Sequence, residues 1–477
     1  MEENENKEIP KEEGKNAGYE PDGFWEDRNV PNPSNHPPMS EGAAVSMPRG
    51  RKIALAVGAV VLALLFFLIG WLSHYYSLSQ EERTLLWIFD RVENDYYKKL
   101  TDEEREAYYD GIFDAAMPDI FSTYFTPEEF RKLQTEREGS NADTGFSVFT
   151  DGEDLRVFLV QGNSPAELAG LKSGMKIYRF GKDADSLRSG NYEDLVAFVR
   201  SNRGSFCMEC GYSEEDKAVY ADLESKEYLA SYCSYADSES SFAFRTKTDD
   251  RGRQMLALTD TGVPMSGLDE KTAYLRFSEF GGNAAEELVI CLKNMRDRGR
   301  KNLILDLRCN GGGYLEILQS VCAHLLRNAE GSNPVVATAK YRSGRKTEFR
   351  ATGNDFSQYF AADSKITVLA DENSASASEC LIGALIDYGT IGYDDIYLRN
   401  DAPGTGRSYG KGVMQSAYLA ANGGGLRLTS AEIFWPKGKS IHGVGVTEAG
   451  DHANGITAPM VRGAEDAFLT QLFARLF

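Results

Sequence analysis

KITVLADENSASASECLIGALIDYG, residues 365–389, runs from an apolar strand through alternating serines and alanines into an apolar helix. Two similar units lie upstream. AYLRF (273–277) is followed by a helix over 283–299, and NLILDLR (302–308) is followed by a helix over 315–326. Repeated strand-to-helix units predict an α/β layer with parallel strands.

The composition limits the classes of function that remain open. A chain of 477 residues is long enough for two or three domains. Its 72 Asp and Glu exceed its 52 Lys and Arg, so it would repel phosphate backbones, and nucleic acid is not expected as a partner. With only five His, a His-rich metal site is not expected. Seven Cys in a chain of this length are too few for a dense disulfide scaffold.

Residues 53–72, IALAVGAVVLALLFFLIGWL, are long and apolar enough to cross a bilayer. A buried core helix and a signal peptide are the alternatives, but signal segments are shorter and lie closer to the N-terminus. Arg49, Arg51 and Lys52 stand directly before the span. Positive charge resists translocation, so we expect a single-pass anchor with a cytoplasmic N-terminus and an extracytoplasmic body.

The flanking segments differ in composition. Residues 1–52 are rich in proline and charge, which predicts a disordered cytoplasmic tail. Residues 73–140 form a helical region, with a capping box expected at Ser79 and Glu82 and a helix start at Thr126. The acidic stretch rich in Tyr and Ser over 212–240 is interpreted as an insertion or mobile loop.

DLRCNGGG, residues 306–313, follows an apolar strand and precedes a helix. Consecutive glycines let backbone N–H groups approach a ligand that carries negative charge. The stretch is therefore either an anion-binding loop, such as an oxyanion hole, or only a tight turn between strand and helix. No Lys-Ser or Lys-Thr pair follows the glycines, which excludes a phosphate-binding P-loop.

Serines at 374, 376 and 378 occupy the strand-to-helix elbow, where a hydroxyl gains exposure and the helix N-terminus favours negative charge. At least one of them is expected only to pack or to cap the helix. Lys411 lies between two glycines in SYGKGVMQ, four residues before Gln415. A buried Lys can act as a general base, and Gln415 could hold its amine. His442 is the alternative base.

In this order, the three motifs resemble those of the carboxy-terminal processing (tail-specific) serine peptidases, which combine a PDZ domain with a Ser-Lys protease core. The resemblance spans roughly residues 85–445. It implies Ser376 as nucleophile, Lys411 as general base and Gln415 as the residue that orients the base. The oxyanion hole would use the N–H groups of Ala377 and Gly312. The fold implied for residues 263–477 is an α/β protease core of the crotonase or Clp type.

Residues 141–262 resemble the family's PDZ domain. SPAELAGLKSGMKI (164–177) looks like its signature, and TGFSV (144–148) stands where the carboxylate-binding loop should be. In such a loop, N–H groups capture a C-terminal carboxylate while the peptide adds to a sheet edge. The residues implied are Gly145, Phe146 and Val148, with the last two lining a pocket for an apolar C-terminal side chain.

Two features depart from the family or stand outside the resemblance. The link over 393–409 is longer than usual, which bears on the position of Lys411. Cys207 and Cys210 form a C-x-x-C pair for which we favour a disulfide over zinc, because no fourth ligand lies nearby.

The expected protein is a membrane-anchored serine endopeptidase of a bacterial plasma membrane, acting on proteins with apolar C-termini. The sequence is compatible with a homo-oligomer but does not specify the oligomeric state. No metal and no organic cofactor are implied. The alternatives are a catalytically silent PDZ scaffold that binds peptides and, on fold analogy alone, a binder of small hydrophobic ligands.

Overall fold

The computed structural model describes residues 48–137, 140–151, 154–202, 204–327, 329, 331–459 and 466–477. Most of the tail predicted over residues 1–52 lies outside these ranges. The chain divides into two compact units, of which the first ends at Leu100 and the second begins at Thr101.

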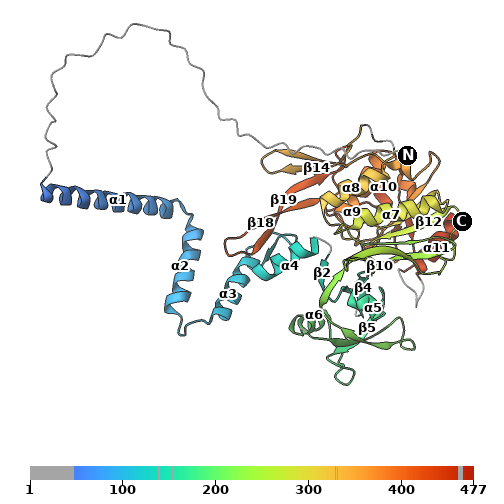
Figure 1. The fold of residues 1–477 in the computed structure, drawn as a ribbon, viewed down its shortest axis with the longest axis horizontal. Coiled ribbons are helices and arrows are strands. Elements are labelled where there is room, and N and C mark those ends of the chain that lie inside the picture. The colour runs from blue at the N-terminus through green and yellow to red at the C-terminus, as the bar shows by residue number, and fades with distance from the viewer. Residues whose placement is uncertain are drawn as a thin grey trace, which may run out of the picture. The chain divides into compact units, whose positions relative to one another are not determined.

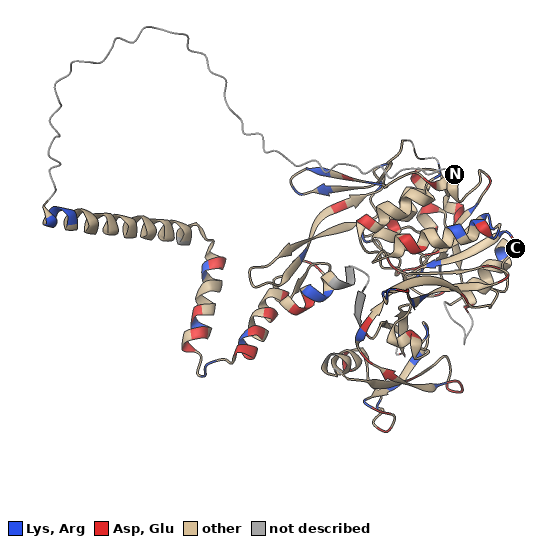
Figure 2. Ribbon diagram, in the orientation of Figure 1, with Lys and Arg blue, Asp and Glu red and all other residues tan. Residues whose placement is uncertain are grey.

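The first unit contains helices α1 (Arg49–Ser77) and α2 (Gln80–Asp95). α1 is apolar and long enough, by length and composition, to cross a membrane over Arg49–His74. Its basic residues gather in the first turn, and the apolar stretch that follows carries none (Figure 2). The capping box predicted at the start of α2 is confirmed, since Ser79 and Glu82 each bind the other's backbone N–H.

The second unit is built on a sheet of eight strands in the order β11-β10-β9-β12-β13-β16-β17-β20 (Figure 1). The predicted parallel layer is confirmed by β12, β13, β16, β17 and β20, while β9, β10 and β11 extend it antiparallel at one edge. The bounds are β9 (Cys233–Ala236), β10 (Ser241–Thr248), β11 (Gln254–Asp260), β12 (Thr272–Phe277), β13 (Asn302–Asp306), β16 (Ile366–Ala370), β17 (Ile396–Arg399) and β20 (Asn454–Ile456).

Helices α7 (Ala284–Asp297), α8 (Leu315–Leu325) and α9 (Ala377–Asp387) follow the parallel strands β12, β13 and β16 and share one apolar core with them. α9 is buried from its first residue through Leu385. Gly383 lets it pack flat on Trp435, because a Cβ there would lie 2.2 Å from the indole ring. The serine-rich elbow at the start of α9 is therefore fixed by the packing of the whole helix.

A second sheet carries residues of the third motif. It has the order β1-β19-β14-β15, with β18 also paired to β19. The bounds are β1 (Thr123–Phe125), β14 (Val335–Tyr341), β15 (Lys346–Arg350), β18 (Val413–Leu419) and β19 (Gly425–Phe434). β1 follows helix α3 (Asp102–Ala115) and precedes α4 (Pro127–Arg137), which Thr126 caps as predicted through the N–H of Glu129.

A five-stranded antiparallel sheet, β3-β4-β5-β6-β7, has its own apolar core with helices α5 and α6. Glu167 of α5 accepts two hydrogen bonds from Arg245 of β10, at 2.8 and 3.2 Å, which join this sheet to the eight-stranded sheet. The bounds are β3 (Phe146–Asp151), β4 (Asp154–Val160), α5 (Pro165–Leu168), β5 (Lys176–Gly181), α6 (Tyr192–Ser201), β6 (Phe206–Gly211) and β7 (Ala218–Leu223).

Of the two interpretations of residues 212–240, an insertion or a mobile loop, the mobile loop is wrong. The interval contains β7, β8 (Lys226–Leu229) and β9, and β8 pairs with β2 (Ser140–Asp143). β9 sits inside the eight-stranded sheet between β10 and β12, so its pairing partners rather than its own composition make it a strand.

The remaining elements are short or terminal: η1 (Phe356–Gln358), η2 (Tyr393–Asp395), α10 (Glu448–Asp451) and α11 (Ala467–Leu476). All seven cysteines are buried as free thiols, so Cys207 and Cys210 on β6 do not form the disulfide that the sequence favoured.

Glu287 of α7 is a buried carboxylate that supports the start of β9. Its Oε2 accepts the N–H groups of Tyr232 and Cys233, both at 2.8 Å, while Oε1 has no hydrogen-bond partner. Burial raises the pKa of Glu287 to about 8, although the two N–H donors oppose this rise. The folded protein therefore holds Glu287 protonated through most of the neutral range.

We expect Glu287→Gln to remove a loss of stability at high pH. An unfolded Glu titrates near pH ~4.3, so the wild-type fold loses stability as the pH rises from there to about 8. Denaturation in urea should show the variant more stable than wild type by about 2 kcal/mol near pH ~8, and by less near pH ~5. The exposed neighbour change Glu286→Gln is the control, and an equal gain at both pH values would contradict the assignment.

Candidate active site

Ser376 stands at the elbow between β16 and α9. Its φ of 57° and ψ of −112° are rare for a residue with a side chain, and such strain persists only where the surroundings impose it. The side chain is half-buried and lines a cavity of about 900 Å³. Among the described residues, none forms a hydrogen bond with its hydroxyl. Ser376 therefore presents a free Oγ to the cavity.

The neighbouring serines have structural roles. Ser374 Oγ donates to the carbonyl of Leu307 at 2.7 Å, and Ser378 Oγ donates to the carbonyl of Asn310 at 2.9 Å. Both side chains are fully buried. They tie the elbow to the glycine turn, and this leaves Ser376 as the reactive candidate of the three.

The glycine turn approaches the elbow so closely that only glycine fits. Gly312 has a φ of 99°, and a Cβ on it would lie 2.8 Å from the carbonyl oxygen of Ala375 and from the nitrogen of Ala377. Its N–H donates to Oδ1 of the buried Asn310 at 2.9 Å. The turn thus lies beside the Ala377 N–H, at the positive end of α9, with the Gly312 N–H engaged by Asn310.

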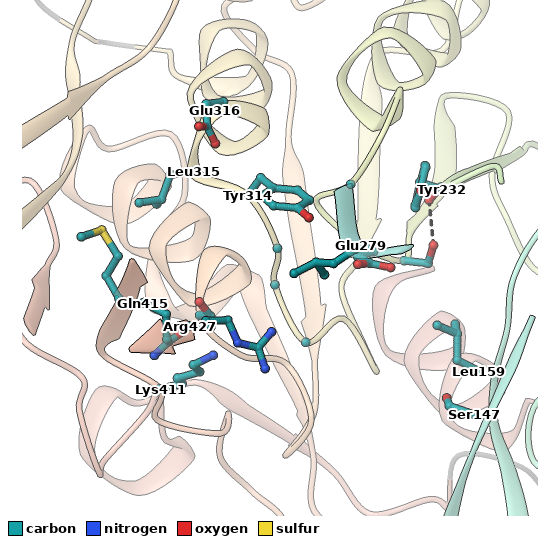
Figure 3. A pocket seen from close by; sticks show the side chains of 18 of the residues that line it. Ser147, Leu159, Tyr232, Glu279, Tyr314, Leu315, Glu316, Lys411, Gln415 and Arg427 are labelled. Atoms are coloured by element: carbon teal, nitrogen blue, oxygen red, sulfur yellow. Dashed lines mark hydrogen bonds between the residues drawn. The ribbon is translucent and has the colours of Figure 1, made fainter. Parts of the chain in front are cut away.

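Lys411 and Gln415 line the same cavity as Ser376 (Figure 3). Burial lowers the pKa of the Lys411 ammonium, the nearby Arg427 lowers it further, and Asp119 and Glu379 oppose both effects. In the described chain no hydrogen bond joins the Lys411 amine to the Ser376 hydroxyl. The structure brings the two groups to one cavity without a hydrogen bond between them.

Gln415 does not bind the Lys411 amine here. Its Nε2 donates to Oγ1 of Thr429 on β19 at 3.2 Å. A β-bulge lies between Met414 and Gln415, where β18 pairs with β19. The predicted hydrogen bond from Gln415 to Lys411 is thus not formed in this structure.

Glu379 is the residue of this site that the sequence analysis did not single out. Its buried Oε2 accepts the N–H groups of Ser376 at 3.0 Å and Lys411 at 2.9 Å. Its Oε1 accepts the Ser408 hydroxyl at 2.5 Å and the Gly410 N–H at 2.7 Å. The available signal was an acidic residue at the start of an otherwise apolar helix.

The Glu379 carboxylate also binds the end of the long link before Lys411. Residues 393–409 pass through η2 and β17, leave the eight-stranded sheet after Arg399 and return at Ser408, where the carboxylate binds them. Burial raises the pKa of Glu379, and its four donors oppose that rise. Because one carboxylate binds both the elbow at Ser376 and the chain at Lys411, the end of the link stays next to the elbow whatever its length.

The cavity reaches from the elbow to the five-stranded sheet. Its lining includes Gly145, Phe146 and Ser147 at the start of β3, the glycine turn, Tyr232 and Tyr314. Val148 does not line it and packs on the apolar core of the five-stranded sheet. Ala377 contributes no lining side chain. His442, the alternative base, is not among the lining residues.

Comparison with known proteins supports the resemblance stated from the motifs. Residues 271–449 match the model of peptidase family S41. The carboxyl-terminal-processing protease of Picosynechococcus sp. is 27% identical over 350 residues, which cover 73% of this chain and 72% of that protein. The carboxy-terminal processing protease CtpB of Bacillus subtilis is 24% identical over 367 residues, covering 75% and 65%.

Among solved structures, the photosystem II D1 C-terminal processing protease is similar with a TM-score of 0.44 and 20% sequence identity. The match covers 78% of this chain and 92% of that one.

Because four donors depend on Glu379, we expect Glu379→Ala to destabilise the fold by about 3 kcal/mol or more. Glu286→Ala is the matched control, since Glu286 holds the same position in the first turn of α7 but is exposed. Its effect should stay within about 0.5 kcal/mol. Chemical denaturation of both variants measures the difference, and equal effects would show that the carboxylate is not the anchor.

Proposed function

We propose that this chain is a serine-type peptidase in which Ser376 is the nucleophile and Lys411 the general base, since residues 271–449 match the model of peptidase family S41 and the carboxyl-terminal-processing protease of Picosynechococcus sp. is similar over most of the chain. One observation carries the proposal: a single cavity holds a strained serine at a helix N-terminus, a half-buried lysine and a glycine turn. These are the parts that acyl transfer requires.

In the proposed reaction, Ser376 Oγ attacks the carbonyl carbon of a peptide bond and its proton passes to the Lys411 amine. The N–H groups of Ala377 and Gly312 stabilise the oxyanion, which competes with Asn310 Oδ1 for the Gly312 donor. Collapse of the intermediate expels the amine, which takes its proton from Lys411. Water then hydrolyses the acyl ester, with Lys411 again accepting a proton. Gln415 orients the amine once it turns from Thr429.

We propose that residues 141–262 act as a PDZ domain that binds substrate C-termini. Gly145 and Phe146 line the cavity that holds Ser376, so a bound C-terminus would lie in the same space as the reacting bond. Among the described strands β3 pairs only with β4, which leaves an edge where a peptide strand can add beside α6. Val148 supports this edge from the core.

The position of the enzyme in the cell follows from α1. We propose that α1 is a single-pass anchor in a bacterial plasma membrane, with a cytoplasmic N-terminus and the peptidase outside. Its support is the basic first turn, Arg49 to Lys52, before an uncharged apolar stretch. The curated relatives named above are bacterial.

We expect Ser376→Ala and Lys411→Ala each to reduce kcat about a thousandfold or more on an unfolded polypeptide with an apolar C-terminus. The exposed changes Ser343→Ala and Lys346→Ala, at the β14–β15 turn, should leave cleavage unchanged. Fragments are identified by mass spectrometry. Cleavage that persists in Ser376→Ala would refute the nucleophile assignment.

A second candidate, a peptide-binding scaffold without catalysis, is favoured by one observation: the Ser376 hydroxyl and the Lys411 amine are not hydrogen bonded. Labelling with a fluorophosphonate separates the two functions, because only an activated serine reacts. A peptide that binds while Ser376 stays unlabelled would favour the scaffold.

We expect binding of a substrate to depend on its C-terminal carboxylate. Amidation of the substrate's terminal carboxylate should raise KM about tenfold with little change in kcat, because the N–H groups near Gly145 lose their anion. Phe146→Ala should raise KM for the free acid in the same way. An unchanged KM for the amide would contradict carboxylate capture.

A further inference from the structure

The turn between α3 and β1 lies against the strands that carry Gln415 and Arg427. Thr429 of β19 donates its N–H to Ser122 Oγ at 3.1 Å and its hydroxyl to Asp119 Oδ1 at 3.2 Å. β1, directly after the turn, pairs with the same strand. A segment from the N-terminal helical region is thus built into the wall of the active site.

Asp119 shapes this turn. Its Oδ1 accepts the N–H groups of Phe121 and Ser122, both at 2.8 Å. The turn holds the Phe121 ring with its centroid 4.9 Å from Lys411 Nζ and 6.3 Å from the centroid of the Tyr409 ring. A cation this close to an aromatic face is attracted by the ring quadrupole.

The same carboxylate reaches Gln415 through one intermediate. Gln415 Nε2 donates to Thr429 Oγ1, and that hydroxyl donates to Asp119. One turn therefore contacts the proposed base through a ring and the residue that orients it through hydrogen bonds. Both contacts end on atoms that line or adjoin the cavity.

We propose that Phe121 and Asp119 are positioning residues for the general base: the Phe121 ring covers one face of the Lys411 amine, and Asp119 holds the ring in place. This inference rests on the proposed function, because it assigns Lys411 the role of base. It goes beyond that function in making the segment before β1 a part of the catalytic apparatus.

The chemistry of the base explains what the ring supplies. By excluding water, the ring favours the neutral form of the amine, which can accept the Ser376 proton. After the transfer, its π-face stabilises the new ammonium, which water would otherwise hydrate. The charged groups that face Lys411 are Arg427 on β19, Glu379 on α9 and Asp119 on the turn.

The sign of the expected pH effect follows from these groups. Burial is the largest cause of the lowered pKa of Lys411, so the water admitted by removing the ring raises that pKa by more than the lost attraction between ring and ammonium lowers it. kcat/KM increases with pH as the base loses its proton, so the acid limb of the profile should move to higher pH. Removing the Asp119 charge should move the limb in the opposite direction, because Asp119 favours the ammonium.

The test measures kcat/KM against pH for the full-length chain in detergent, with the unfolded polypeptide as substrate. Phe121→Ala should move the acid limb up by about half a unit to one unit and reduce kcat/KM near neutral pH about three- to tenfold. Phe121→Tyr keeps the ring and should restore the wild-type limb. The control is Ile120→Ala, since Ile120 is the adjacent apolar residue and is 82% exposed.

Asp119→Asn is a second variant that tests the inference if Phe121→Ala does not fold. Asn keeps an Oδ1 that accepts the same two N–H groups, so the turn should persist while the limb moves down by a few tenths of a unit. A limb that stays at its wild-type position in both variants overturns the inference, as does an equal shift in Ile120→Ala. Ser376→Ala and Lys411→Ala run in parallel. If both are inactive, an unmoved limb refutes only the inference, whereas activity in either refutes the proposed function as well.

Discussion

The carboxylate of Glu379 is the interaction on which the geometry of the site depends. It binds four donors that come from two regions of the chain, the elbow at Ser376 and the return of the link from Ser408 to Lys411. A buried carboxylate without donors would be costly, so the fold gains only if both regions are in place together. Ser376 and Lys411 are thus positioned as one unit, although no hydrogen bond joins their side chains.

Much of this arrangement is predictable from local sequence. The apolar strands and helices around residues 302–326 and 365–389 specify the parallel layer because each signal lies within a few residues of its neighbour. The same holds for the helix starts at Ser79 and Thr126, where the side chain and its backbone partner are three residues apart. The motif containing Gly312 predicts a turn that only glycine can make, and the close approach to Ala377 shows why.

Other parts depend on contacts between distant residues, and the sequence carries no local sign of them. The short strand β9, CSYA, lies in an interval rich in Asp, Glu, Ser and Tyr, yet it has a partner on each side in the sheet, and these partners supply its hydrogen bonds. Gln415 lies four residues after Lys411, but a bulge and the nearness of Thr429 give it another partner. Phe121 could not be connected to Lys411 by spacing, because only the pairing of β1 with β19 brings its turn to the site.

The link before Lys411 is fastened at two points. Arg399, at the end of β17 within the link, is paired with Glu372, and Ser408 is bound to Glu379 near the end of the link. Between these points, Pro403 and Gly404 are exposed, and lengthening a closed surface loop costs little entropy. An epitope or a small reporter domain inserted there would leave Lys411 in register with Ser376, so the link offers a place to label the protein without disturbing the site.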